Sequence, residues 1–280
     1  MALHFYDDTI LLGFSWEKGG AQYCYRQMQL LLGTLLDPKK SQRMSSEPSY
    51  IGVLLDLSNL LSGGVLRILP KEGRVEGILK KIDDIFAEDS LSPAEASSLM
   101  GKLNFLSSHA AGKLLRGSLS ALAQRAHDRS TRQLLPVLSS ALQFARLLLH
   151  KFPVKSITYG KAKLPIVHYW TDAMWEPPAP AGVGFFLYVP GLQPICGMAT
   201  VPTGLLAQLL DRKQQIGQVE ALACLLGPHN YPVHFRSRDV IHYIDNTSAL
   251  SGCIAGGSRV ADSNCIFQLH SLKLAELGCR

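Results

Sequence analysis

Three acidic residues in the second half of the chain occupy positions where a carboxylate is costly unless something neutralises it. Asp172 ends the apolar run 167–172, and Asp245 ends a second apolar run at 240–245. Glu220 falls in a predicted helix, at the edge of the apolar stripe and not on the opposite, solvated side. Because side chains alternate along a strand, Asp172 should share a face with Trp170. The pattern therefore predicts carboxylates beside apolar surface.

Carboxylates gathered at a partly apolar site are typical ligands of divalent cations. Two such ions about 4 Å apart activate water and stabilise the leaving oxygen in phosphodiester hydrolysis. Taken singly, each residue is better explained as a turn residue or an edge glutamate. The order of a strand with Asp, a three-stranded meander, a helix with Glu and a strand with Asp-Asn is harder to obtain by chance. We predict that Asp172, Glu220 and Asp245 converge at the carboxyl edge of one sheet, within reach of shared cations.

A second acidic pair, Asp7-Asp8, separates two short apolar runs at 2–6 and 9–14. This arrangement predicts a β-hairpin with an acidic tip. Aspartate is a favoured turn residue, so the pair by itself indicates only a solvated turn.

The elements that position these residues follow from hydrophobic periodicity and turn residues. In the first half we expect a helix at 21–36, strands at 50–57 and 65–69, a helix at 74–86 and mostly helix from 92 to 150. Ser92, Pro93 and Glu95 predict a capping box at the start of the helix that follows them. Residues 153–165 are predicted to be a linker.

In the second half we expect strands at 166–171, 182–189, 195–201 and 240–245, with helices at 206–226, from 247, and at 262–277. The predicted fold class is therefore α/β, more narrowly α+β, with a mixed sheet and flanking helices. Trp170, Trp175 and Tyr188 are expected in its core, because large aromatic residues in strands are most often buried.

Composition limits the class of protein. The 280 residues are 47% hydrophobic and 18% charged, which suits one large domain or two ordinary ones. A net charge of +6 permits a polyanionic partner without requiring one. No apolar run is long enough for a membrane span and the N-terminus does not resemble a signal peptide, so we expect an intracellular protein, in cytoplasm or nucleus. The six cysteines form no C-x-x-C pair and have no histidine at zinc spacing, which predicts buried free thiols.

The second half resembles the ribonuclease H-like domain of retroelement reverse transcriptases. Residues 171–173 are similar to its first-strand T-D-A/S motif, residues 220–223 to its helix A glutamate motif and residues 244–250 to its D-N-x-A-L segment. The resemblance implies that Asp172, Glu220 and Asp245 bind two Mg²⁺ (or Mn²⁺) ions and that the RNA strand of an RNA-DNA hybrid is cut. The family usually adds one further aspartate near the end of the domain. It has no counterpart here, since Asp262 comes too early.

The first half resembles the end of a reverse transcriptase palm, followed by the thumb and connection. Residues 5–8 are similar to the F/Y-x-D-D hairpin, 32–40 to the next palm motif, 50–53 to the primer grip, and 99–105 to the L-x-G-K-L-N-F helix of DIRS and Ty3 elements. The resemblance implies that Asp7 and Asp8 are metal ligands and that a template-primer is contacted by four basic residues, Lys39, Lys40, Arg74 and Lys102. The alternative for these four is an ordinary solvated surface.

Together the resemblances predict a partial palm, thumb and connection at 1–160 and a ribonuclease H-like domain, lacking its C-terminal end, at 161–280. The palm aspartate that would join Asp7 and Asp8 has no counterpart, which argues against polymerase activity by this chain alone. We expect a fragment of a retrotransposon RNA-directed DNA polymerase and ribonuclease H, with RNA-DNA hybrid or template-primer as partner and no membrane. The alternatives are a non-catalytic degenerate fragment that at most binds nucleic acid, and another nuclease or an integrase of the same fold.

Overall fold

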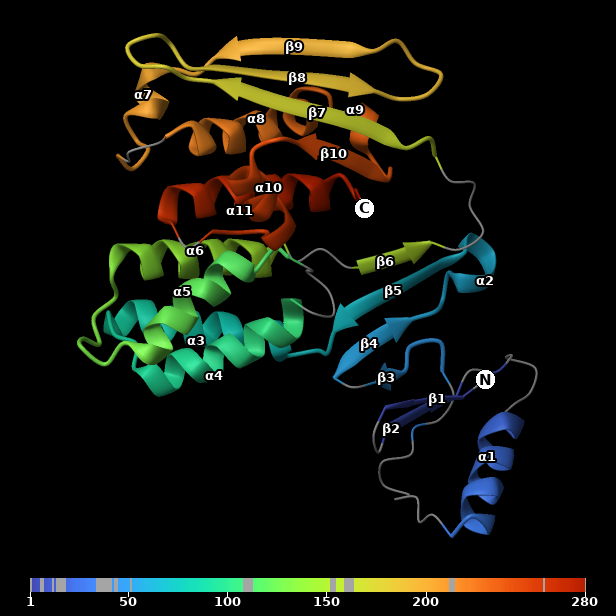
Figure 1. Cartoon of the computed structure of the whole chain (residues 1–280). Helices are drawn as coiled ribbons and strands as arrows, with labels where there is room; N and C mark the ends of the chain where they lie inside the picture. The colour runs from blue at the N-terminus through green and yellow to red at the C-terminus, as the bar shows by residue number, and fades with distance from the viewer. Residues whose placement is uncertain are drawn as a thin grey trace. The chain divides into compact units, whose positions relative to one another are not determined.

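A computed structural model gives the fold of the chain (Figure 1). It describes residues 2–5, 8–11, 13, 19–33, 42, 45–50, 52–107, 113–151, 155–158, 164–211, 215–258 and 260–279. The chain divides into two compact units. The first comprises Met1–Val75 and Val154–Lys161, and the second comprises Glu76–Pro153 and Ala162–Arg280.

The first unit contains a hairpin, a helix and an antiparallel sheet. Strands β1 (Ala2–Phe5) and β2 (Asp8–Leu11) form the predicted hairpin. Helix α1 (Gly20–Leu31) ends before the predicted residue 36, because Gly33 adopts a φ of 75° that terminates the helix. The sheet has the order β3-β4-β5-β6, with β3 (Ser49–Tyr50), β4 (Val53–Asp56), β5 (Val65–Pro70) and β6 (Lys155–Thr158). The short helix α2 (Leu60–Gly63) connects β4 to β5.

Strand β6 lies inside residues 153–165, so the prediction of a linker there is wrong for 155–158. The strand pairs antiparallel with β5, which places Ile157 opposite Leu66. Four residues are too few for their alternation to be recognised in a sequence. The hydrogen bonds of β6 depend on a partner that is distant along the chain, which a local pattern does not reveal.

Four helices precede the second sheet: α3 (Arg74–Glu88), α4 (Pro93–Leu106), α5 (Arg116–His127) and α6 (Pro136–His150). The predicted capping box begins α4. The backbone N–H of Glu95 donates to Ser92 Oγ at 3.3 Å, and the N–H of Ser92 donates to the Glu95 carboxylate at 3.1 Å. Hydrogen bonds from Lys81 and then from Ser92 lower the pKa of Glu95 to about 2. The box therefore ties the start of α4 to α3 as well as capping it.

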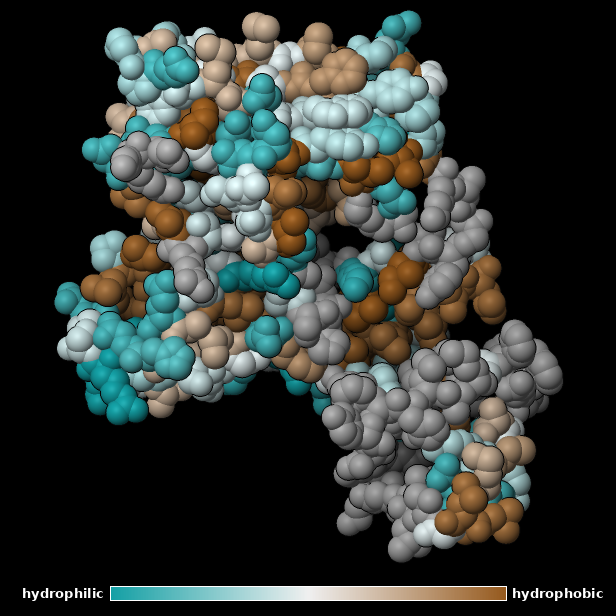
Figure 2. Space-filling model, in the orientation of Figure 1, coloured by the Kyte–Doolittle hydropathy of each residue, from teal (hydrophilic) through white to brown (hydrophobic). Residues whose placement is uncertain are grey.

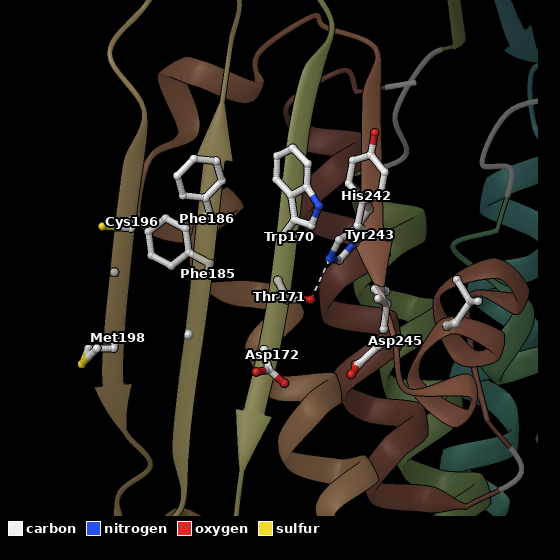
Figure 3. A pocket seen from close by; sticks show the side chains of 14 residues that line it. Trp170, Thr171, Asp172, Phe185, Phe186, Cys196, Met198, His242, Tyr243 and Asp245 are labelled. Atoms are coloured by element: carbon white, nitrogen blue, oxygen red, sulfur yellow. Dashed lines mark hydrogen bonds between the residues drawn. The ribbon is translucent and has the colours of Figure 1, made fainter.

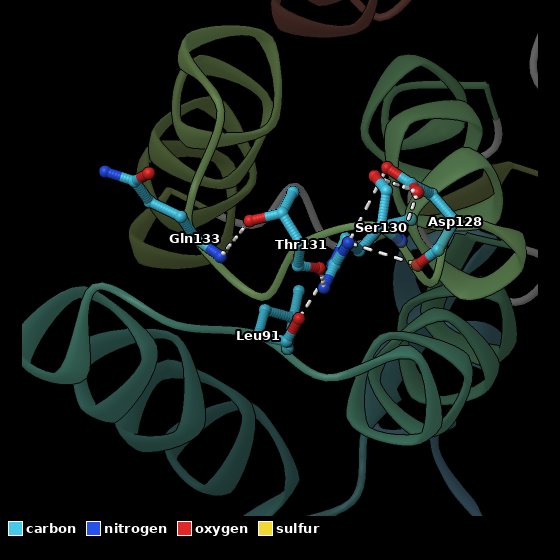
Figure 4. A network of polar contacts seen from close by, with 6 residues as sticks. Leu91, Asp128, Ser130, Thr131 and Gln133 are labelled. Carbon is cyan, nitrogen blue, oxygen red and sulfur yellow. Dashed lines mark hydrogen bonds and ion pairs between the residues drawn. The ribbon is translucent and has the colours of Figure 1, made fainter.

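Buried Arg125 holds the loops between these helices together, and Figure 4 shows the polar network that includes its partners Leu91, Asp128 and Thr131. Arg125 is 4% exposed, and its guanidinium donates to the backbone carbonyls of Leu91 at 2.7 Å, Asp128 at 3.1 Å, and Thr131. The Asp128 carboxylate lies 3.7 Å from the guanidinium and supplies a negative charge. Because a buried charge is tolerated only when it is paired and hydrogen-bonded, this side chain fixes the path of the surrounding loops.

The second sheet has the order β10-β7-β8-β9. Strands β7 (Val167–Met174), β8 (Gly182–Tyr188) and β9 (Ile195–Thr200) form the predicted antiparallel meander, and β10 (Val240–Ile244) lies parallel to β7. The accompanying helices are α7 (Thr203–Leu206), α8 (Ile216–Asn230), α9 (Pro232–Phe235), α10 (Thr247–Ala255) and α11 (Ala261–Glu276).

The helix predicted at 206–226 is instead divided between α7 and α8. The backbone N–H of Leu210 donates to the Asp262 carboxylate at 2.9 Å, where a continuous helix would direct it to a carbonyl one turn earlier. A side chain that is distant in sequence therefore determines the path of the segment between the two helices.

One face of the second sheet packs against α8, and the other is open (Figure 1). Tyr169 is buried on the packed face, where its hydroxyl accepts a hydrogen bond from the N–H of Gly227 at 2.8 Å. Trp170 and Tyr188 lie on the open face and are 37% and 38% exposed, so the prediction that they are core residues is wrong. Trp175 does pack against a hydrophobic cluster. Alternation separates the two faces of a strand but does not say which of them is covered.

From Glu76 onward, helices α3 to α6 belong to the same compact unit as the second sheet. Helix α5 packs so closely on α11 that a Cβ at Gly117 would overlap the side chain of Gln268. The Arg116 guanidinium also donates to the carbonyl of Ala255 at 3.2 Å. These contacts join residues far apart in sequence and hold α5 against the helices of the second sheet, while the domain boundary at residue 160 that the resemblance implies stays a prediction.

Within the described part of the chain, the structure contains no helix with the length and apolar character needed to cross a membrane. Figure 2 shows hydrophilic and hydrophobic residues interspersed over the face of the second unit that is in view.

Candidate metal centre

Asp172 and Asp245 lie on neighbouring strands at the same level of the sheet. Strand β10 lies parallel to β7, and Ile244 pairs with Thr171. The next residue along the chain is an aspartate in each case, Asp245 after Ile244 and Asp172 after Thr171. Both carboxylates are exposed, and Figure 3 shows them side by side. Asp172 lies two residues before the end of β7, not at its end as predicted, because pairing with β8 continues to Met174.

A helix cap fixes the backbone immediately after Asp245. The Asn246 side-chain oxygen accepts hydrogen bonds from the backbone N–H groups of Ser248 and Ala249, each at 3.0 Å. Asn246 is therefore the N-cap of α10, and the chain turns from strand into helix directly behind Asp245. Asp245 and Asn246 thus have different roles. Asp245 lies beside Asp172, and Asn246 caps the helix that begins after the turn.

Glu220 approaches the same point from helix α8. One carboxylate oxygen from each of Asp172, Glu220 and Asp245 lies within 4.8 Å of the other two. Glu220 is only 4% exposed, which makes it more deeply buried than the helix edge expected from the sequence. The structure thus brings together the three acidic residues that the sequence singled out, while their role as metal ligands stays a prediction.

The Glu220 carboxylate is only partly satisfied, because a hydrogen bond from the backbone of Ala173 lowers its pKa less than the other causes raise it. Burial raises the pKa of Glu220 to about 7, and the charges of Asp245 and then Asp172 add to the rise. Its Oε2 atom is buried and has no hydrogen-bond partner among the described residues. A divalent cation would supply the missing favourable interaction. The donor set consists of carboxylate oxygens alone, and it therefore suits Mg²⁺ or Mn²⁺ better than a soft metal ion.

A pocket of about 890 Å³ includes Asp172 and Asp245 in its lining (Figure 3). Aromatic rings on the open face of the sheet form part of its wall, among them Trp170, Phe186 and Tyr243. The rings of Trp170 and Tyr243 stack with their centroids 4.5 Å apart. The acidic residues therefore border a surface that can receive a ligand with flat, apolar parts.

The remaining predicted site residues are described only in part. Asp7, Lys39 and Lys40 lie outside the described residues, and of Asp8 only the backbone is described, in β2. Arg74 is half-buried at the start of α3, and Lys102 is exposed on α4. The contacts of these six residues with metal or nucleic acid stay predictions.

Asp262 does not join the three carboxylates, in agreement with its position in the sequence. It accepts hydrogen bonds from the backbone N–H of Leu210 at 2.9 Å and from the side chain of Gln218. Its carboxylate therefore organises the start of α8.

The cysteines differ in part from their prediction. All six are free, as expected, but Cys24, Cys196 and Cys265 are exposed, so the prediction of buried thiols is wrong for these three. The structure also gathers Cys224, His242 and Cys253 in one place, a group that the sequence analysis missed. One weak signal was present: Cys224 lies one helical turn after Glu220.

Comparison with known proteins adds little to this geometry. No protein-family model and no curated protein matches the chain. Among solved structures it is similar to the foamy viral protease-reverse transcriptase dRH in complex with double-stranded DNA, with a TM-score of 0.39 and 16% identity. The match covers 94% of this chain and 42% of that one, so the chain spans less than half the length of this distant structural neighbour.

Proposed function

We propose that the chain carries a divalent-metal nuclease site that cuts the RNA strand of RNA-DNA hybrids, as part of a retroelement reverse transcriptase and ribonuclease H. The observation that carries the proposal is the convergence of Asp172, Glu220 and Asp245 within 4.8 Å from three separate elements. The motifs around these same residues, which resemble those of ribonuclease H-like domains, support it.

The three carboxylates differ in their exposure, and therefore in how each would bind the ions. Asp172 and Asp245 are exposed at the pocket, where a phosphate group can approach. Glu220 is buried and reaches the other two carboxylates from helix α8. When bound, Mg²⁺ or Mn²⁺ lowers the pKa of the attacking water and offsets the charge that develops on the leaving oxygen. Because the pKa of Glu220 is about 7, its proton must leave as the ligand set forms.

The surroundings of the carboxylates suit a nucleic acid. Exposed aromatic rings such as Trp170 and Tyr243 border the acidic residues and can stack against sugars or bases. The chain as a whole is basic, with a net charge of +6, although the site itself is acidic. This net charge favours association with a polyanion.

Hydrolysis of a hybrid tests the proposal directly. We expect the purified chain, with Mg²⁺ or Mn²⁺, to cut the labelled RNA strand of an RNA-DNA hybrid, and to leave duplex DNA intact. Asp172→Asn should lower the rate by more than about 100-fold, because loss even of groups that orient a metal ligand costs 10–100-fold. Glu176→Gln, which alters an exposed acidic residue just after β7, is the matched control. Cleavage that survives Asp172→Asn, or no cleavage by the unaltered chain, would contradict the proposal.

A second candidate is a scaffold that binds nucleic acid without cutting it. The observation in its favour is that the acidic group has three members among the described residues. Asp262 does not add a fourth, since its carboxylate accepts hydrogen bonds from Leu210 and Gln218. Hybrid binding that weakens with salt, with no metal-dependent turnover, would select this candidate over the enzyme.

A further inference from the structure

A second group of metal-ligating side chains is carried by elements that also lead to the carboxylates, and one member, Cys224, lies one helical turn after Glu220. Cys224 on α8, His242 on β10 and Cys253 on α10 each present one sulfur or nitrogen atom within 4.8 Å of the other two. Cys224 is fully buried, and the other two side chains are half-buried. The group therefore joins three elements in a region that is largely shielded from water.

The distances within the group fit a metal ion better than a covalent link. The Sγ atoms of Cys224 and Cys253 are 3.8 Å apart. Two Zn–S bonds of 2.3 Å at the tetrahedral angle would place the sulfurs about 3.8 Å apart. A disulfide requires about 2.05 Å, so the two sulfurs as they lie are not bonded. Two thiols in simple contact have a similar separation, and uptake of a metal ion distinguishes a ligand pair from such a contact.

The imidazole is held in place by its neighbours. The hydroxyl of Thr171 lies 3.0 Å from Nε2 of His242, and Figure 3 shows this contact. The ring of His242 also packs on Tyr169, with centroids 4.6 Å apart, and lies 5.8 Å from the buried ring of His270. Fixed orientation of a ligating histidine by surrounding groups is a feature of protein metal sites.

We propose that Cys224, His242 and Cys253 form a second cation site, for a soft metal ion of the Zn²⁺ type. Thiolate and imidazole ligands select Zn²⁺ over Mg²⁺ or Mn²⁺, whereas the three carboxylates have the opposite preference. The two sites are thus separated by ligand chemistry although they are close in space.

An ion bound to the thiols and imidazole would support the elements that carry the carboxylates. Cys224 lies one turn after Glu220, and its Sγ is 3.4 Å from the Glu220 carbonyl oxygen. His242 precedes Asp245 by three residues, and Cys253 belongs to the helix that Asn246 caps. Linking these residues through one ion restrains α8, β10 and α10 against one another, which makes the site a positioning device and not a second catalytic centre.

Cobalt uptake tests the inference independently of nuclease activity. Reduced, metal-free protein is titrated with Co²⁺ under anaerobic conditions while the thiolate-to-cobalt absorption band and the tetrahedral visible bands are recorded. We expect one Co²⁺ per chain, displaced by one equivalent of Zn²⁺. Cys253→Ser and His242→Gln should each weaken uptake by at least 10-fold. Cys265→Ser, which alters an exposed cysteine, should leave it unchanged.

Two further measurements keep this test decisive. Circular dichroism shows whether each variant is folded, and Zn²⁺ should raise the melting temperature of the parent protein but not of Cys253→Ser. Asp172→Asn should retain the thiolate band, which separates the inference from the nuclease proposal. The inference is overturned if no saturable thiolate band forms, if the band persists in Cys253→Ser, or if mild oxidation links Cys224 to Cys253 in a protein that takes up no cobalt.

Discussion

Replacing Glu220 with glutamine should stabilise the metal-free protein at alkaline pH. The carboxylate is 4% exposed, lies within 4.8 Å of two other carboxylates, and has one oxygen without a hydrogen-bond partner among the described residues. Burial, then Asp245 and Asp172, raise the pKa of Glu220 from 4.5 to about 7. The ionised form is therefore disfavoured in the folded state. A glutamine is neutral and can donate its N–H groups to the two aspartates.

The magnitude follows from the shift in pKa. Each unit of pKa shift corresponds to about 1.4 kcal/mol, so the rise from 4.5 to about 7 changes the free energy of unfolding by about 3 kcal/mol. Between pH 4.5 and 7 the folded protein binds more protons at Glu220 than the unfolded chain does, so the free energy of unfolding falls as the pH rises. The contribution is fully present below pH 4.5 and is lost once the pH exceeds about 7. Glu220→Gln removes this dependence, because the amide does not titrate.

Urea unfolding with EDTA at pH 5 and pH 8 measures the effect. We expect Glu220→Gln to be more stable than the parent by about 1–3 kcal/mol at pH 8 and nearly equal to it at pH 5. Glu276→Gln, which alters an exposed glutamate on α11, provides the baseline. The reasoning is refuted if Glu220→Gln is destabilised at pH 8, or if the difference between the two proteins is the same at both pH values.

Added Mg²⁺ should reverse the order of stability at pH 8. An ion that binds only the folded state stabilises it by about 2.7 kcal/mol at 100 times its dissociation constant. The parent should gain this stability and Glu220→Gln should not, because the amide carries no charge to offset. Equal stabilisation of both proteins would show that the ion binds elsewhere.

Two further predictions concern the packing of the second unit, and thermal unfolding measures both. Gly252→Ala should destabilise the protein by about 1–3 kcal/mol, because the added methyl group overlaps the ring of Phe267, whereas Gly204→Ala, which has open space around it, should be nearly neutral. Arg125→Ala should cost about 3–5 kcal/mol, because it empties a buried position and removes a charged donor from the carbonyls of Leu91, Asp128 and Thr131. Loss of the exposed Arg146 should cost less than about 1 kcal/mol. Equal effects within either pair would contradict the burial argument.

Local sequence signals predicted much of this protein correctly, because the interactions concerned span only a few residues. The capping box of Ser92 and Glu95 is visible as a spacing of three and forms as predicted. The strands that carry Asp172 and Asp245 were visible as apolar runs. Where the prediction failed, as at β6 or in the segment before α8, the deciding hydrogen bond came from a residue distant along the chain, such as Asp262.

The apolar pattern alone placed Asp172 and Asp245 at two strands and Glu220 on a helix, and it thereby made these three residues candidates for one site. The folded chain was needed to show that β10 pairs with β7 in the register that sets the aspartates side by side, that Glu220 is buried, and that Trp170 lies on an open face. The same packing brings together Cys224, His242 and Cys253 from three elements, and their spacing along the sequence does not match a known metal motif. The physical reason is that periodicity reports the two faces of an element, whereas register and burial depend on partners that lie elsewhere in the chain.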